Sequence, residues 1–156
     1  MRKHGGFWAA AIVVGAFGLA ACGSSSSPSS STSTTAIAPA AAVATGTYAP
    51  AGAAGTPHYV ITVSSTTSTG FDGAMNFVYQ DGTTSRVFDF SATVTGRRAV
   101  ATPSNVAAPG SGAQTVSSVP SALPIDIGTD ALTFERCQAY LPQAHSPSAC
   151  TFTGSS

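Results

Sequence analysis

Two neighbouring stretches of the chain alternate between apolar and polar residues, and this alternation predicts β-strands. They cover residues 73–80 and residues 85–95. The apolar residues at every second position are Met75, Phe77 and Tyr79 in the first stretch and Phe88, Phe90, Ala92 and Val94 in the second. Successive side chains of a strand point to opposite faces, so each set is expected to share one buried face.

The sequence DGTT at residues 81–84 separates the two stretches and predicts a hairpin. Both apolar sets must face the core, and a one-residue slip would turn one set outward. A four-residue loop over 81–84 satisfies this condition and pairs Phe77 with Phe88 and Met75 with Phe90. A two-residue Asp-Gly turn preserves the same faces but shifts each partner by two residues. We expect this hairpin to be the centre of the core.

Shorter strand-like stretches, separated by turn residues, precede and follow the hairpin. They cover residues 58–67, 97–102, 113–119, 124–127, 131–140 and 149–153. The side chains expected to face inward are Tyr59, Ile61, Val63, Val100, Leu132, Phe134 and Phe152. No stretch here has a sustained helical period. Residues 57–156 are therefore expected to form one all-β domain, a small antiparallel sandwich or a compact barrel of about seven short strands.

Residues 22–56 have a different composition from the β-rich part. Serine, threonine, alanine, proline and glycine predominate, and the only residues larger than valine after Cys22 are Ile37 and Tyr48. Such a segment buries too little apolar surface to offset its chain entropy. We therefore expect a disordered linker. Its Ser/Thr-rich run is read as a plain spacer, with O-glycosylation as the alternative.

The first 22 residues form a tripartite export signal. Arg2 and Lys3 precede an uncharged apolar run over residues 7–21, which is shorter than the roughly 20 residues of a membrane span. The run ends in Leu-Ala-Ala-Cys, and this box resembles the lipobox of bacterial lipoproteins. The resemblance implies that residues 1–21 are a signal peptide, that cleavage falls between Ala21 and Cys22, and that Cys22 carries the lipid.

The same resemblance implies a location and a membrane partner. The lipid on Cys22 would anchor the exported protein, since two or more acyl chains hold a protein stably on a bilayer. In bacteria with two membranes, aspartate after the lipidated cysteine commonly marks retention in the inner membrane, and this chain has Gly23 there. We expect the outer membrane, facing the periplasm, or the outer face of the plasma membrane in a cell with one membrane.

Lipidation of Cys22 would leave two cysteines, Cys137 and Cys150. An even pair in an exported chain predicts a disulfide, because the compartments outside the cytoplasm are oxidising. The alternative is a metal or redox pair. The spacing differs from CxxC, and no second pair of cysteines or histidines supports zinc. We therefore expect a Cys137–Cys150 disulfide, no metal and no cofactor.

The charge of the chain argues against nucleic acid as a partner. Only 8% of the residues are charged, and after Cys22 four arginines face six acidic side chains, a formal charge of −2. Binding to a phosphate backbone requires a basic surface, which this composition lacks. Arg97 and Arg98 are the densest basic spot, and they are interpreted as the solvated start of a strand rather than as an anion site.

The sequence offers few candidates for catalysis. His58 and His145 are the only histidines after the signal, and Ser111, between two glycines, lacks the strand–turn–helix context of a hydrolase nucleophile. The tyrosines could stack against sugars, but strand spacing favours core positions. The only local group of carboxylates is Asp126, Asp130 and Glu135. Its spacing differs from a calcium-binding EF-hand loop, and its members are read as turn and surface residues.

These patterns lead to an expected function and two alternatives. We expect a lipid-anchored cell-envelope lipoprotein that presents a small non-enzymatic β domain for binding or for a structural role, with a protein, glycan or lipid as its unidentified partner. The first alternative is a carrier of an apolar ligand inside a small barrel lined by Phe77, Phe88 and Phe90. The second is a hydrolase of envelope polymers, for which no catalytic residues are identified.

Overall fold

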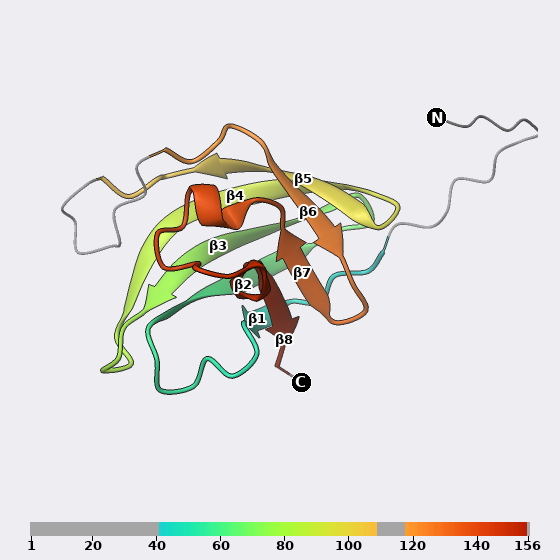
Figure 1. Ribbon diagram of the computed structural model, residues 1–156. Helices are drawn as coiled ribbons and strands as arrows, with labels where there is room; N and C mark the ends of the chain where they lie inside the picture. The colour runs from blue at the N-terminus through green and yellow to red at the C-terminus, as the bar shows by residue number, and fades with distance from the viewer. Residues whose placement is uncertain (1–40, 109–117, 156) are drawn as a thin grey trace, which may run out of the picture. The chain divides into compact units, whose positions relative to one another are not determined.

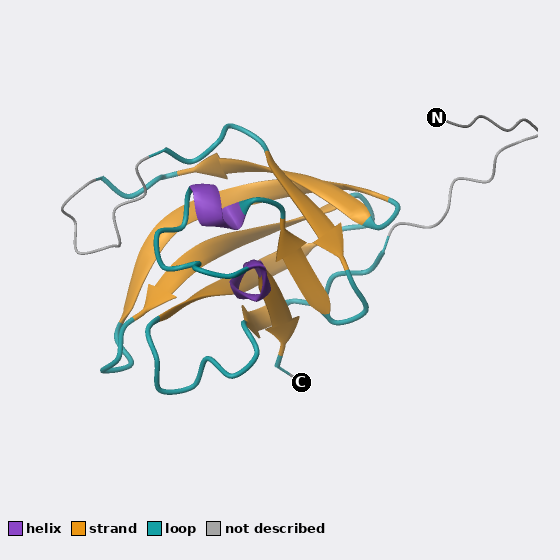
Figure 2. Ribbon diagram, in the orientation of Figure 1, coloured by secondary structure: helices purple, strands orange, loops and turns teal. Residues whose placement is uncertain are grey.

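The computed structural model describes residues 41–108 and 118–155, which form a closed antiparallel barrel of eight strands (Figure 1). Two short 3-10 helices precede the last strand (Figure 2). The strands are β1 (Gly46–Ala49), β2 (His58–Thr66), β3 (Gly70–Val78), β4 (Thr84–Thr95), β5 (Arg98–Ser104), β6 (Leu123–Ile127), β7 (Ala131–Phe134) and β8 (Thr151–Gly154), and the helices are η1 (Cys137–Ala139) and η2 (Pro147–Cys150). The all-β class and the barrel are therefore established.

Each strand pairs with the next along the chain, and β1 closes the barrel by pairing with β8 as well as β2. In that closing pair, Tyr48 lies opposite Gly154 and Ala49 opposite Thr153. The predicted linker over residues 22–56 is therefore wrong for its last part, because β1 lies within it. Tyr48 is buried there, and the backbone of β1 is paired on both sides. The extra strand also raises the count from about seven to eight.

The predicted central hairpin forms between β3 and β4, but with a different register. Met75 lies opposite Phe88, not Phe90, and Phe77 lies opposite Ser85. Residues 79–83 form a five-residue loop, and the register shifts at Val87, which is buried beside Phe88. With a five-residue loop alone, Phe88 and Phe90 would point away from the core. The extra residue at Val87 turns them back toward it. The inward faces were thus predicted correctly, whereas the partners expected from a four-residue loop were wrong; the pairing of Met75 with Phe88 is the one that the two-residue turn implies.

Phenylalanine side chains fill the barrel interior. Phe77, Phe88, Phe90, Phe134 and Phe152 are all fully buried, together with Ile61, Met75, Leu123 and Leu132. Successive rings meet edge to edge or edge to face, with centroids 5.7 Å apart for Phe90 and Phe134 and 6.0 Å apart for Phe134 and Phe152. Small barrels are commonly packed in this way. The interior is a core of interlocking aromatic rings.

Several expected strands have different limits or faces. Val100 was expected to face inward, but it is 49% exposed, and Ala99 and Ala101 are buried in its place. The expected strand over residues 131–140 ends at Phe134, because a left-handed residue and η1 follow. Of the expected strand over 113–119, residues 113–117 lie outside the described part, and residues 118 and 119 are not in a strand.

Both ends of the barrel are covered by chain. At one end, residues 41–45 cross beside the β6–β7 turn, and Ala41 donates a backbone hydrogen bond to Gly96. Ala41 and Val43 pack against the core from this side. At the other end lies the segment 135–150, which buries Tyr140, Leu141 and Ala144. We call residues 41–45 the strap and residues 135–150 the plug.

Candidate functional site

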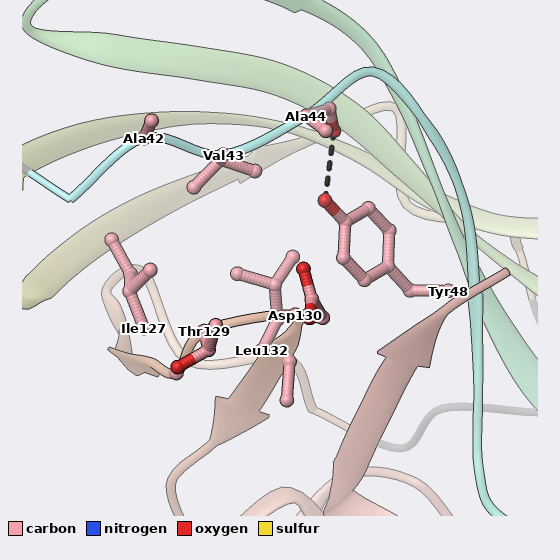
Figure 3. A pocket seen from close by; sticks show the side chains of 10 residues that line it. Ala42, Val43, Ala44, Tyr48, Ile127, Thr129, Asp130 and Leu132 are labelled. Carbon is pink, nitrogen blue, oxygen red and sulfur yellow. Dashed lines mark hydrogen bonds between the residues drawn. The ribbon is translucent and has the colours of Figure 1, made fainter. Parts of the chain in front are cut away.

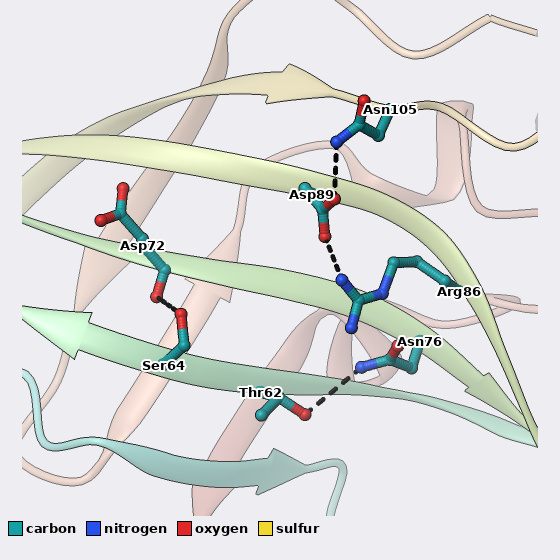
Figure 4. A network of polar contacts seen from close by, with 7 residues as sticks. All are labelled: Thr62, Ser64, Asp72, Asn76, Arg86, Asp89 and Asn105. Atoms are coloured by element: carbon teal, nitrogen blue, oxygen red, sulfur yellow. Dashed lines mark hydrogen bonds and ion pairs between the residues drawn. The ribbon is translucent and has the colours of Figure 1, made fainter.

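The outer surface of β3 and β4, together with Asn105 just after β5, carries a polar network (Figure 4). Arg86 donates to Asp89 over 2.6 Å, and Asn105 donates to the other carboxylate oxygen of Asp89 over 2.9 Å. A shallow depression of about 90 Å³ lies next to these groups. The charges of Arg86 and Asp89 neutralise each other, and an exposed ion pair of this kind contributes little to the free energy of folding. The Arg86–Asp89 pair thus orders this part of the surface.

Asp72 belongs to the same outer face and accepts two hydroxyl hydrogen bonds. Ser91 donates to one carboxylate oxygen and Ser65 to the other, each over 2.7 Å. These bonds, that from Ser91 first, lower the pKa of Asp72 from its ordinary value. The carboxylate therefore links the outer positions of β2, β3 and β4. Asp72 itself lies within β3.

A second depression lies beneath the strap (Figure 3). It has a volume of about 160 Å³, and its lining includes Val43, Tyr48 and the β6–β7 turn at residues 128–130. The hydroxyl of Tyr48 donates to the carbonyl oxygen of Ala44 over 2.8 Å. This hydrogen bond ties the strap to β1. The depression is thus formed by a structural contact, and its polar tyrosine is already satisfied.

The two candidate histidines do not form a catalytic pair with a serine. His58 lies in a depression of about 210 Å³ that Ser146 and Ser148 also line. However, His58 bonds through Nδ1 to the carbonyl oxygen of Thr56, and the two serine hydroxyls bond to each other over 2.9 Å. His145 is exposed. No hydrogen bond links His58 to a serine within residues 41–108 and 118–155, so the geometry lacks an activated nucleophile.

The carboxylate group that the sequence singled out is only partly brought together. Arg98 donates to Asp126 over 3.0 Å and to Glu135 over 3.1 Å, whereas Asp130 lies apart in the β6–β7 turn. Arg98 thus pins the outer faces of β5, β6 and the end of β7 together. Among the described residues, no group of three His, Cys, Asp or Glu side chains could hold a metal ion.

The sequence did not single out a fourth depression, formed by Arg136 and Tyr140 of the plug together with the approach to β6. It has a volume of about 410 Å³. The lining residues are Pro120, Ala122, Leu123, Pro124, Glu135, Arg136, Ala139 and Tyr140. We call it the Arg136 pocket. The separation of its two walls along the chain hides it from any local sequence pattern.

Two features of the Arg136 pocket stand out. Arg136 has φ 54° and ψ 26°, the left-handed conformation that is uncommon for a residue other than glycine. Its guanidinium is exposed and has no ion pair with any described residue. Burial raises the pKa of Tyr140, so its hydroxyl stays protonated, and that hydroxyl has no hydrogen-bond partner among the described residues.

The plug is held by the predicted cysteine pair. Cys137 in η1 and Cys150 in η2 lie at disulfide distance, with Cα atoms 5.6 Å apart. Both side chains are buried. The predicted lipidation and cleavage positions, Cys22 and Ala21, lie outside the described residues, as do the predicted signal peptide and the first part of the predicted linker.

The described residues include no helix that is both long enough and apolar enough to cross a membrane. Comparison of the chain with protein-family models, with curated proteins and with solved structures finds no match in any of the three.

Proposed function

We propose that this chain is a lipid-anchored lipoprotein of the bacterial cell envelope, in which a closed β-barrel serves as a non-enzymatic binding or structural module. The observation that carries the second half of this proposal is the filled interior. Six phenylalanines occupy it, and the strap and the plug cover its ends. A partner is therefore met on the outer surface. The lipobox-like residues 19–22 carry the first half.

The alternative of an apolar carrier is less well supported. A carrier needs an enclosed, apolar space, and such sites usually have volumes of about 300–1,000 Å³. Phe77, Phe88 and Phe90, the residues proposed to line it, are instead buried, with Phe88 and Phe90 in edge contact at a centroid distance of 6.4 Å. Admitting a lipid would require the aromatic core to separate.

The tether is shorter than residues 22–56 suggest, because the described structure already includes the strap from residue 41. Residues 23–40 would join the lipid to the strap. A chain of 18 residues spans at most about 60–65 Å. The barrel would then be held close to the bilayer, tethered from the strap end.

The decisive test is the chemical state of residue 22 in the exported protein. Intact mass spectrometry of the native protein is expected to show a chain that begins at Cys22 and carries diacylglycerol or three acyl chains. A Cys22→Ser variant is expected to move from the membrane fraction to the soluble exported fraction. A Cys137→Ser/Cys150→Ser variant is the matched control and should remain in the membrane fraction.

Two outcomes would contradict the proposed function. One is a native protein that retains Met1, which would rule out processing at Cys22. The other is a Cys22→Ser variant that remains in the membrane fraction like the wild type, which would show that another part of the chain provides the attachment.

A further inference from the structure

We propose that the Arg136 pocket is a binding site for a small carboxylic acid with an apolar body, such as an aromatic acid or a short aliphatic acid. This inference deepens the proposed function by naming the site on the outer surface and the class of ligand. It rests on that function only in placing recognition outside the barrel, and it does not depend on lipidation of Cys22.

The size and lining of the pocket suit such a ligand. Its volume of about 410 Å³ lies within the usual range of small-molecule sites, about 300–1,000 Å³. Most of the wall is apolar, and its lining includes the buried residues Leu123 and Tyr140 together with proline and alanine side chains. Small-molecule sites typically combine an apolar wall of this kind with a few polar groups that orient the ligand.

Arg136 supplies the positive charge of the pocket wall. Glu135 is the other charged lining residue, and it shares Arg98 with Asp126, at 3.1 Å and 3.0 Å. Arg136 has no such partner among the residues that the structure describes. A guanidinium presents parallel N–H donors that match the two oxygens of a carboxylate. An unpaired arginine beside an apolar wall therefore favours an acid over a neutral molecule of the same shape.

The backbone holds Arg136 in place. Its left-handed conformation joins β7 to η1, where Glu135 donates a backbone hydrogen bond to Pro124 and Ala139 donates one to the carbonyl of Arg136. The next residue, Cys137, is fixed by its pairing with Cys150. Unfavourable backbone conformations persist where the surroundings impose them, and they are frequent at ligand sites. Glycine would fit this conformation better, so the presence of arginine calls for a reason.

The test uses the full mature chain in detergent, with binding measured by titration calorimetry. The probes are benzoate and hexanoate, with benzamide and hexanamide as uncharged counterparts of the same shape. At least one acid is expected to bind about tenfold more tightly than its amide, the ratio for one charge-assisted hydrogen bond. The better of the two acids then shows whether the wall prefers a ring or an aliphatic chain.

An Arg136→Gly variant tests the residue itself. Glycine removes the cation and suits the left-handed backbone, so the variant should fold with unchanged or higher stability while its affinity for the acid falls about tenfold or more. Arg97→Gln is the matched control, because it removes an exposed arginine at the opposite end of the barrel. Its affinity should match that of the wild type. Equal binding of acid and amide, retention of affinity by Arg136→Gly, or no acid binding at millimolar concentration would each overturn the proposal.

Discussion

Gly73 and Phe90 lie opposite each other on β3 and β4, and the missing side chain at Gly73 provides the space for the Phe90 ring. A Cβ atom at position 73 would lie 2.8 Å from Cζ of Phe90 and 2.7 Å from the carbonyl oxygen of Thr62. Contacts this short require a neighbour to move. The glycine is thus needed for close packing in the barrel interior.

We expect Gly73→Ala to lower the free energy of unfolding by about 1–3 kcal/mol, the usual cost of overpacking a core. Urea unfolding followed by circular dichroism measures this change. Leucine at position 90 removes the ring that the new methyl group would meet. The loss in free energy of unfolding for Gly73→Ala combined with Phe90→Leu should therefore be smaller than the sum of the losses for the two single variants. Strictly additive costs would show that the ring and the new methyl group do not meet.

The limits of the folded domain can be tested by shortening the chain. A chain that begins at residue 41 keeps the strap and β1, so it should unfold at the same urea concentration as a Cys22→Ser chain that begins at residue 22. A chain that begins at residue 57, the boundary expected from sequence, lacks β1 and leaves β2 and β8 unpaired on one side. It should show no cooperative transition. Cooperative unfolding of that shorter chain would contradict the role of β1 in closing the barrel.

Removing the Cys137–Cys150 pair should destabilise the plug. The two cysteines are 13 residues apart, and closing a loop of this size contributes about 3 kcal/mol in the chain-entropy model. A Cys137→Ser/Cys150→Ser variant is therefore expected to unfold at a clearly lower denaturant concentration. Reductant should shift the wild type toward the variant and leave the variant unchanged. An unchanged midpoint in the variant would show that the bridge adds no stability.

The hydroxyl bonds to Asp72 predict a pH dependence. Its pKa is lower in the folded state than the ordinary value of 3.8, so the folded state favours the carboxylate. The resulting contribution to stability is present above pH 3.8 and is lost as the pH falls through the folded pKa. Ser91→Ala removes the bond with the largest effect and should raise the pKa of Asp72 toward 3.8.

The measurement is an NMR titration of the Asp72 carboxyl carbon in the wild type and in Ser91→Ala. Asp81 provides an internal control, because Thr83 lowers its pKa through separate hydrogen bonds. The titration of Asp81 should be the same in both proteins. An unchanged Asp72 titration would show that the Ser91 hydroxyl does not hold the carboxylate in solution.

Local alternation in the sequence determined which side chains form the core. Tyr59, Ile61 and Val63 face inward on β2 as predicted, and so do Leu132 and Phe134 on β7. This is possible because the two faces of a strand follow directly from its period of two residues. The cysteine pair was also predicted, from the expectation that Cys22 is lipidated and the chain exported, which leaves two cysteines with one pairing.

Only the tertiary structure decided how the strands close into a barrel and where a ligand can bind. β1 is a short stretch without alternation, so no local pattern predicts it. It forms because its backbone pairs with β8 at the far end of the described chain. The bulge at Val87 and the exposure of Val100 likewise depend on neighbouring strands. The Arg136 pocket joins residues 120–124 to residues 135–140, which the pairing of β6 with β7 brings together. Pairing and pockets arise from contacts between distant segments, and a single sequence records only the local preferences of each segment.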